Sequence, residues 1–244
     1  MANFNVLYAG QLRFVECAQY HKMHIEGAGS IDAAFVDSVF DIWNTNIGSK
    51  HSINNLNFNE SLDFFKQTIN PTSCTVVDVK KYINLIDVSK SRFFLYQQLF
   101  LMLNHLKEND VVFFLTPEIV FNKKTSLDFK QIAKSVPQES PKAFGWVADN
   151  NMLHNHFMYF NRLGVRTLKE RWHTLRFLDI KDANIENIWY KIITDCGVEV
   201  MSSELVNMDN YCLRFKNNMD FDKITDYKYL NEKRNQWTMI REGI

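Results

Sequence analysis

Two short polar segments each follow an apolar run, although they lie far apart in the sequence. Gly10-Gln11-Leu12-Arg13 follows the apolar run 4–9, and Thr116-Pro117-Glu118 ends the run that begins at Asp110. In an α/β sheet, ligands collect where the carboxyl ends of central strands meet the following loops. A guanidinium is a planar, two-pronged donor for phosphate, and a carboxylate can ligate Mg²⁺ or Mn²⁺ through oxygen. The two segments therefore predict a site for an anionic substrate and a metal, such as a nucleotide-sugar site.

The pattern of apolar residues predicts the elements that hold these segments. β-branched runs bounded by turn residues indicate strands, and apolar residues three or four positions apart indicate helices. We expect strands at 4–9, near 38–43, and at 75–79, 111–115, 144–147, 172–180 and 198–201, and helices at 11–26, 60–69, 89–107, 152–163 and 184–195. Strands that alternate with helices are typical of an α/β layer. We therefore predict an α/β fold, with residues 1–244 forming a single domain.

The composition is that of an ordinary globular protein. The chain has 244 residues, of which 46% are hydrophobic and 23% charged, and its 28 basic and 28 acidic residues give a net charge of zero. A protein that grips bare nucleic acid usually has a basic excess, which is missing here. The composition therefore favours a protein with a sizeable core and a partner other than bare nucleic acid.

The four cysteines, Cys17, Cys74, Cys196 and Cys212, are scattered and include no Cys-x-x-Cys pair. They are expected to be free thiols in a reducing compartment. The first residues lack the basic and apolar regions of a signal peptide, and the apolar stretch 93–103 is too short to span a bilayer. We expect a cytoplasmic protein without a transmembrane segment.

Two acidic residues are candidates for a general base. Asp149, beside Asn150, follows the expected strand 144–147, and a carboxylate there could take the proton of an acceptor hydroxyl. The same pair could instead be the N-cap of the next helix, and the two roles are compatible. Glu186 is either a second base or a first-turn residue favoured by the helix dipole.

Two histidine pairs occur at spacings that metal sites use, His21-x-x-His24 and His154-Asn-His156. No third ligand stands near either pair in the sequence. We therefore expect these histidines to be core or surface residues and not zinc ligands.

Four segments, in this order, resemble the motifs of a known family. Ala9–Arg13, Ser38–Asn44, Arg92–Leu106 with its Gln97-Gln98 pair, and Asn109–Phe121 are similar to bacterial and viral glycosyltransferase-like proteins related to the WavE-type lipopolysaccharide enzymes. The order and spacing of the segments carry the resemblance, because each segment alone is common. The resemblance implies a single Rossmann-like, GT-A-type domain with a mixed, mostly parallel central sheet, which uses a nucleotide-diphosphate sugar.

The resemblance also implies roles for individual residues. The donor-binding residues would be Gly10, Gln11, Arg13, Trp43, Arg92 and Gln97, and Glu118 would ligate Mn²⁺ or Mg²⁺. Asp149 matches an acid that relatives often show near the acceptor, and Glu186 is the second catalytic candidate. Residues 1–121 would bind the nucleotide-sugar and residues 122–244 would form the acceptor side. The chain departs from the family at Thr116-Pro117-Glu118, where relatives tend to have Arg-x-Asp.

Three functions are compatible with these patterns. The first is a glycosyltransferase that moves a sugar from a nucleotide-diphosphate donor to a glycan or lipid-linked acceptor. The second is a degenerate binding module, which Thr116 in place of the usual Arg favours. The third is a phage-type sugar transferase that acts on modified DNA bases, against which zero net charge speaks. The donor sugar, the acceptor, the stereochemical outcome and the oligomeric state are left open.

Overall fold

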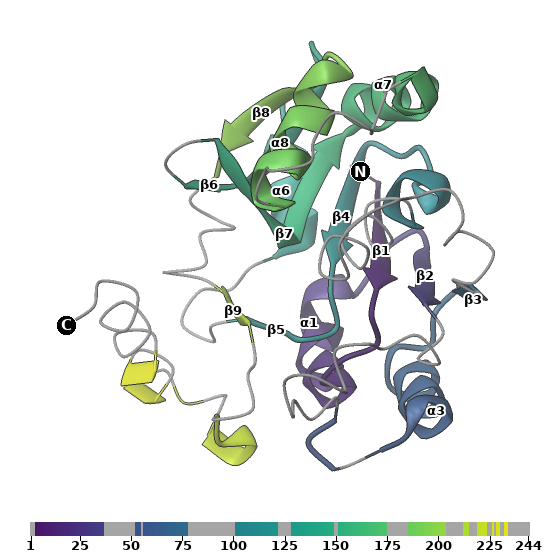
Figure 1. Ribbon diagram of the computed structural model, residues 1–244, viewed down its shortest axis with the longest axis vertical. Coiled ribbons are helices and arrows are strands. Elements are labelled where there is room, and N and C mark those ends of the chain that lie inside the picture. Colours follow the sequence, from purple (N-terminus) through teal and green to yellow (C-terminus); the bar gives the residue numbers. More distant parts are fainter. Residues whose placement is uncertain are drawn as a thin grey trace.

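The computed structural model describes residues 3–36, 52–54, 56–77, 101–121, 128–148, 151–174, 185–203, 212–214, 219–223, 226, 228–229 and 232–233. Its main sheet has seven strands in the order β3-β2-β1-β4-β7-β6-β8, and a smaller sheet pairs β5 with β9 (Figure 1). The strands are β1 (Phe4–Gly10), β2 (Ile31–Val36), β3 (Ser73–Val77), β4 (Val111–Leu115), β5 (Ile119–Phe121), β6 (Lys142–Ala148), β7 (Met152–Asn161), β8 (Glu199–Ser202) and β9 (Cys212–Arg214).

The helices alternate with the strands in the chain, apart from a last short one that follows β9. They are η1 (Val15–His21), α1 (Lys22–Ile25), α3 (Phe58–Ile69), α6 (Phe129–Ser135), α7 (Arg162–Arg171), η3 (Trp172–Thr174), α8 (Ile185–Asp195) and η6 (Phe221–Lys223), where η marks a 3-10 helix. Residues 101–105 are also helical and lead into β4.

The directions of the strands define the type of sheet. β1 pairs in parallel with β2 and β4, β2 with β3, and β6 with β8, whereas β7 runs antiparallel to both of its neighbours, β4 and β6. All strands of this sheet except β7 therefore point the same way. The chain goes from β1 to β2 and β3 on one side and then returns to the other side as β4, so the switch point lies between β1 and β4. The predicted fold class, a Rossmann-like α/β fold with a mixed, mostly parallel sheet, is confirmed.

Helices cover both faces of the sheet. Because side chains alternate along a strand, Val6 and Tyr8 of β1 join one buried cluster while Leu7 and Ala9 join the other. η1, α1, α3 and α6 close the first cluster, and residues 101–106, α7 and α8 close the second. All residues of β1 and β4 are buried, which is typical of central strands with helices on both sides.

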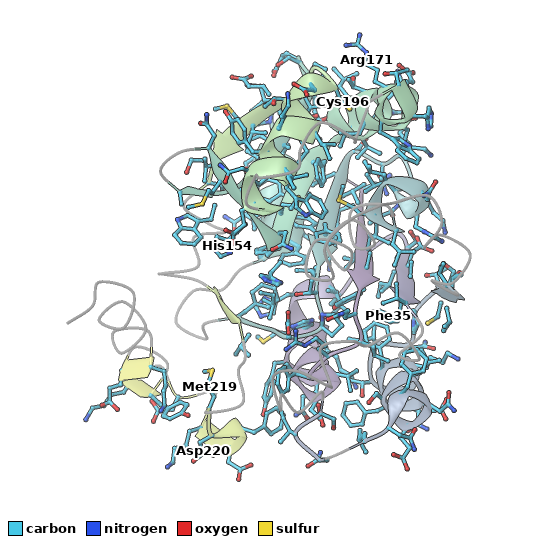
Figure 2. The ribbon with its side chains drawn as sticks, in the orientation of Figure 1. Phe35, His154, Arg171, Cys196, Met219 and Asp220 are labelled. Carbon is cyan, nitrogen blue, oxygen red and sulfur yellow. The ribbon has the colours of Figure 1, made fainter. Side chains whose placement is uncertain are left out.

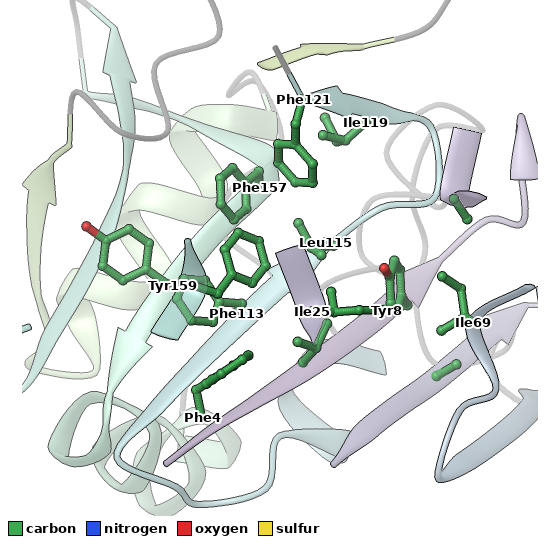
Figure 3. Close-up of a cluster of buried hydrophobic side chains, with 14 of the residues drawn as sticks. Phe4, Tyr8, Ile25, Ile69, Phe113, Leu115, Ile119, Phe121, Phe157 and Tyr159 are labelled. Atoms are coloured by element: carbon green, nitrogen blue, oxygen red, sulfur yellow. The ribbon is translucent and has the colours of Figure 1, made fainter. Parts of the chain in front are cut away.

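Stacked aromatic rings fill the first cluster where α6 meets the sheet (Figure 3). The ring of Phe129 lies 4.1 Å from that of Phe113, nearly parallel to it, and 5.7 Å from that of Phe157. Phe4 meets the edge of Phe113 at a centroid distance of 5.6 Å. These contacts fix β1, β4 and β7 relative to each other, because offset and edge-on aromatic pairs add to the free energy of burial.

The helix expected at 60–69 is confirmed as α3, and its start has a clear cause. Asn57 accepts a hydrogen bond from the backbone of Glu60 at 3.0 Å, and the Glu60 carboxylate accepts one from the backbone of Asn57 at 2.8 Å. This reciprocal capping box satisfies two amide groups that the first helical turn leaves open. The helix expected at 184–195 and the strands expected at 4–9, 144–147 and 198–201 are also present, with bounds that differ by one or two residues, and the strand expected at 111–115 has the expected bounds.

Two expected helices differ from the structure. The segment 11–26 forms the 3-10 helix η1 and the short helix α1, preceded by Phe14 in a left-handed conformation with φ of 45°. The segment 152–163 is mostly the strand β7, and a helix begins only at Arg162. Of the expected strand 172–180, the described residues 172–174 form η3 instead. The strand expected near 38–43 lies outside the described residues, and β2 is formed earlier, at Ile31–Val36.

Candidate functional site

The site begins at the carboxyl end of β1. Gly10 has φ of 118°, a conformation that favours glycine, and the chain then turns sharply through Phe14. This turn directs Arg13 toward the loop that follows β4, where Arg13 Nε lies 3.8 Å from Glu118 Oε2. The two side chains are 17% and 6% exposed. The prediction that these two distant segments converge is confirmed, and they converge at the switch point of the sheet.

Glu118 also faces a histidine from β7. Its Oε1 atom lies 3.4 Å from Nδ1 of His156, and the hydroxyl of Thr116 lies 3.3 Å from the same nitrogen. The backbone amide of Thr116 donates to the carbonyl of His156 at 3.0 Å, which continues the β4–β7 pairing by one residue. Glu118 is therefore held between a guanidinium on one side and an imidazole on the other.

A buried histidine fixes the turn that presents Glu118. His21 Nε2 lies 2.6 Å from the carbonyl oxygen of Ile119, and its Nδ1 lies 2.9 Å from the hydroxyl of Tyr8. The carbonyl can only accept, so Nε2 donates to it and Nδ1 accepts from Tyr8. Burial lowers the pKa of His21 from 6.5 to about 4, although the bond to Ile119 raises it. His21 is thus a neutral bridge between β1 and the start of β5.

The amino-terminal part of β7 contains a bulge. β6 and β7 pair Gly145 with Met158 and Val147 with Leu153, so three residues of β6 (145–147) lie opposite six of β7 (153–158). Leu153 and Phe157, both odd-numbered, consequently face opposite sides of the sheet, in different buried clusters. The surplus segment consists of His154, Asn155 and His156. Bulges of this kind re-aim side chains and are common beside active sites.

The bulge brings a second acid–base pair to the same edge of the sheet. His154 Nε2 lies 3.8 Å from Oε1 of Glu186 in the first turn of α8, and these side chains are 16% and 19% exposed. The ring of Trp146 lies 4.2 Å from that of His154, and the rings of His154 and His156 are 6.3 Å apart. Figure 2 shows His154 beside β6 and β7.

Arg13, Glu118, His156, His154 and Glu186 therefore form one row along the carboxyl edge, called the charged row below. It crosses from the loop after β1 to the start of α8, and its members come from four separate segments of the chain. Acidic residues stand near each end, with the two imidazoles between them. Such a row can bind an anion at Arg13 and move a proton at an imidazole.

Several polar atoms of the segment 11–16, which contains Arg13, are buried without a hydrogen-bond partner among the described residues. They are Nε2 of Gln11, Nε of Arg13 and Oε2 of Glu16. The other carboxylate oxygen of Glu16 accepts from the hydroxyl of Ser52 and from the backbone of Asn54, the latter at 3.0 Å. Buried polar groups are normally satisfied, so a group of unsatisfied ones indicates a place where a ligand can supply the missing partners.

The described residues do not by themselves make a site for Mg²⁺ or Mn²⁺. Within the described part of the chain, no group of three or more His, Cys, Asp or Glu side chains is arranged to hold a metal. Glu118 and His156 give two ligands, and the Arg13 guanidinium 3.8 Å from Glu118 would repel a cation. Octahedral Mg²⁺ prefers several oxygen ligands, so this set does not fit it. The metal role of Glu118 stays a prediction that no described contact supports.

The predicted site residues divide into two groups. Gly10, Gln11, Arg13, Glu118 and Glu186 all lie at the carboxyl edge of the sheet. Trp43, Arg92, Gln97 and Asp149 lie outside the described residues, so their roles stay predictions.

His154 and His156 were expected to be core or surface residues; His156 is buried and His154 is partly buried, and both lie in the charged row. The one signal in the sequence is their closeness to Asp149, the acid predicted to stand near the acceptor, which they follow by five and seven residues.

Sequence comparisons find no match, neither to a protein-family model nor to a curated protein. The WavE-type resemblance is therefore not confirmed.

Among solved structures, the glycosyltransferase GlyE of Streptococcus pneumoniae is 10% identical, with a TM-score of 0.44 over 84% of this chain and 46% of that one. The inositol-1-phosphate CTP transferase of T. maritima is 12% identical, with a TM-score of 0.41 over 97% of each chain. The bifunctional glycosyltransferase WbbM is 12% identical, with a TM-score of 0.44 over 96% of this chain and 44% of that one.

This chain spans less than half the length of the GlyE and WbbM structures. All three TM-scores lie below 0.5, so no activity is carried over from these proteins to this chain. Among the described residues, no helix has both the length and the apolar character that crossing a bilayer requires.

Proposed function

We propose that this protein is a transferase that binds a nucleotide-diphosphate sugar and moves the sugar to an acceptor hydroxyl. The observation that carries the proposal is the meeting of Arg13 and Glu118, 3.8 Å apart, at the switch point between β1 and β4. Open α/β sheets bind their ligands in the crevice at this point. An arginine there matches the charge of a diphosphate, and Gly10 allows a ligand to approach the backbone closely.

The described side chains have complementary tasks in this proposal. Arg13 binds the diphosphate and stabilises the negative charge that grows on it as the sugar leaves. Gln11 offers its buried Nε2 as a further donor. Glu118 positions the guanidinium of Arg13 through their ion pair, and His21 fixes the turn that contains Glu118 by its hydrogen bond to the carbonyl of Ile119. Trp43, Arg92 and Gln97 as donor contacts and Asp149 as a base are proposed from the resemblance alone. The acceptor is a glycan, a lipid-linked sugar or a modified nucleobase.

Calorimetric titration with UDP, GDP and CMP and with their sugar conjugates tests the proposal. Each titration is done in EDTA and again with Mn²⁺, so that metal use is measured and not assumed. We expect binding of one nucleotide class, weakened roughly 10- to 100-fold in Arg13→Gln because a charge-assisted hydrogen bond to phosphate is lost. Arg162→Gln is the matched control, since Arg162 pairs with Glu108 on the exposed surface.

Two results contradict the proposal. One is an absence of heat with every nucleotide and nucleotide-sugar, and the other is wild-type affinity in the double variant Arg13→Gln/Glu118→Gln. Tight binding without any turnover of the sugar conjugate would instead favour the degenerate binding module.

A further inference from the structure

We infer that Glu16 accepts a hydrogen bond from a ribose hydroxyl of the bound nucleotide and makes the site selective for ribonucleotides. This inference rests on the proposed function and names the part of the nucleotide that a further residue recognises. Glu16 lies in the first turn of η1, three residues after Arg13. The argument stands on the burial of the Glu16 carboxylate, on the contacts of its two oxygen atoms and on its place beside the anion-binding arginine.

The two oxygen atoms of the Glu16 carboxylate have different surroundings. The residue is buried, at 1% exposed. Oε1 accepts from the hydroxyl of Ser52 and from the backbone amide of Asn54, whereas Oε2 has no hydrogen-bond partner among the described residues. A buried carboxylate oxygen without a donor lowers the stability of the folded protein. Because Ser52 and Asn54 fix the carboxylate, Oε2 is left as a hydrogen-bond acceptor in a defined position.

Glu16 lies close to the arginine that binds the diphosphate in the proposed function. Burial raises the pKa of the Cys17 thiol, and the negative charges of Glu16 and Glu118 raise it further. Both carboxylates therefore lie near the same buried side chain. Glu118 is in turn the ion-pair partner of Arg13. The turn after β1 thus holds an unsatisfied donor, Nε of Arg13, and an unsatisfied acceptor, Oε2 of Glu16, in one region.

The chemistry of these atoms limits what each can bind. A carboxylate repels phosphate and accepts a hydrogen bond only from a donor, such as a hydroxyl or an N–H group. In a nucleotide, the ribose with its hydroxyls is joined directly to the phosphates, and the base lies beyond it. An acceptor close to the phosphate-binding arginine therefore meets the ribose hydroxyls first. The unsatisfied Nε2 of Gln11, in the same turn, can donate to the same sugar, since a hydroxyl oxygen accepts as well as donates.

The affinity of the wild type for deoxynucleotides tests the inference without any variant. UDP, GDP and CMP are each compared by calorimetry with their 2′-deoxy and 3′-deoxy analogues, which lack one hydroxyl and keep the base and the phosphates. We expect one analogue of the nucleotide that binds to be roughly 10- to 100-fold weaker, because a hydrogen bond to a buried charged group is lost. That analogue identifies the hydroxyl that Glu16 recognises. Equal affinity for the ribonucleotide and both analogues overturns the inference.

Glu16→Gln tests whether Glu16 is the residue that recognises the ribose. The amide keeps an oxygen for Ser52 and Asn54 and replaces Oε2 by a nitrogen that cannot accept. We expect the preference for the ribonucleotide over the weaker analogue to fall about tenfold, because the charge-assisted hydrogen bond is lost. Affinity for the analogue itself should stay near wild type. Glu26→Gln, the same change at an exposed position, should keep the wild-type preference.

A purely structural role of Glu16 gives a different result. If Glu16 only ties the loop 52–54 to η1, Glu16→Gln and Ser52→Ala weaken the ribonucleotide and its analogues by the same factor. The preference for ribose then equals that of the wild type in both variants, which overturns the inference. A changed preference among UDP, GDP and CMP with an unchanged preference for ribose also overturns it, because Glu16 would then recognise the base.

The two proposals fail in different ways. A nucleotide that binds as tightly in its deoxy forms as in its ribose form overturns the role of Glu16 and leaves the proposed function standing. Absence of binding by every nucleotide defeats the proposed function and the role of Glu16 with it. If Glu16→Gln fails to fold, Glu16→Asp decides, since it keeps the charge and draws the carboxylate back by one methylene. A wild-type preference for ribose in Glu16→Asp then contradicts the inference.

Discussion

The two edges of the main sheet carry similar side chains but bond them differently. At the amino edge, the buried carboxylate of Asp32 accepts hydrogen bonds from Ser30, Ser73 and Lys107. Burial alone would raise the pKa of Asp32, but the hydrogen bonds from Lys107, Ser73 and Ser30 outweigh it and lower the pKa. Groups within the protein therefore stabilise the negative charge of Asp32.

Asn161 is likewise fully hydrogen-bonded at the amino edge, where the antiparallel strand β7 ends. Its amide nitrogen donates to the carbonyls of Pro137 and Ser140, both at 2.7 Å. Its amide oxygen accepts from the backbone of Lys142 at 3.0 Å and from that of Gly164 at 2.8 Å. One side chain thereby joins β6, β7 and α7, and all four of its hydrogen-bonding positions are satisfied.

At the carboxyl edge, the pairs of opposite charge are longer, at 3.4–3.8 Å, and three buried polar atoms have no hydrogen-bond partner among the described residues. Among the described residues, the named polar groups of the amino edge are therefore satisfied by hydrogen bonds within the protein, whereas these three atoms of the carboxyl edge are not. Unsatisfied buried polar groups reduce stability, so their concentration at one edge supports the proposal that this edge binds a ligand.

The largest expected effect tests the amino edge. Asn161→Ala removes four hydrogen bonds and leaves two amide and two carbonyl groups without their partner. At about 1 kcal/mol for each, the free energy of unfolding should fall by about 4 kcal/mol. Urea unfolding followed by circular dichroism measures this loss.

The control for Asn161 is Ser135→Ala, which removes one hydrogen bond at the exposed end of α6 and should change stability by less than about 0.5 kcal/mol. Nucleotide affinity should be equal in folded Asn161→Ala and in the wild type. A loss of under 1 kcal/mol in Asn161→Ala would break the contrast between the two edges.

The next effect concerns His21, which lies at the carboxyl edge but is bonded like the polar groups of the amino edge. Its pKa is about 4 in the folded protein, below its ordinary value of 6.5. The unfolded chain therefore binds the proton more readily. Stability is fully present above about pH 6.5 and is lost as the pH falls toward 4, by about 3 kcal/mol from this group.

Urea unfolding at pH 7, 6, 5 and 4 measures the loss. His21→Gln should be less stable than the wild type at pH 7, but its stability should fall less steeply between pH 6.5 and 4. His173→Gln, at an exposed histidine, should follow the wild type throughout. Parallel curves for His21→Gln and the wild type would show that His21 is not the group that titrates.

Much of the fold could be predicted because local signals agree with tertiary structure. The strands at 4–9 and 111–115 are continuous apolar runs, and a residue that stops a strand stands at or shortly after the end of each, Gly10 in one case and Pro117 in the other. The convergence of Arg13 with Glu118 followed from a general rule, that the carboxyl ends of parallel strands meet at one edge.

β7 could not be predicted in the same way. Apolar residues at 153, 157, 158 and 160 match a helical period, because the strand is buried on both faces and the bulge reverses the alternation between Leu153 and Phe157. Helix and strand cannot be distinguished by periodicity in such a segment. The position that the two histidines share could not be predicted for the same reason, since it depends on the bulge and on the contact with Glu186 from α8.

The smallest expected effect is the most direct test of the comparison. Gln11→Leu replaces a buried amide, whose Nε2 has no hydrogen-bond partner among the described residues, by an apolar side chain of similar size. Removing an unsatisfied buried polar group should raise the free energy of unfolding by up to about 1 kcal/mol. Nucleotide affinity should fall roughly tenfold, because the ligand loses a donor.

Gln131→Leu, at an exposed position of α6, should leave the free energy of unfolding and the nucleotide affinity near wild type. A rise in stability together with a loss of affinity is the signature of a group kept for a ligand. A fall in stability in Gln11→Leu would mean that Gln11 serves the fold, as Asn161 does at the opposite edge.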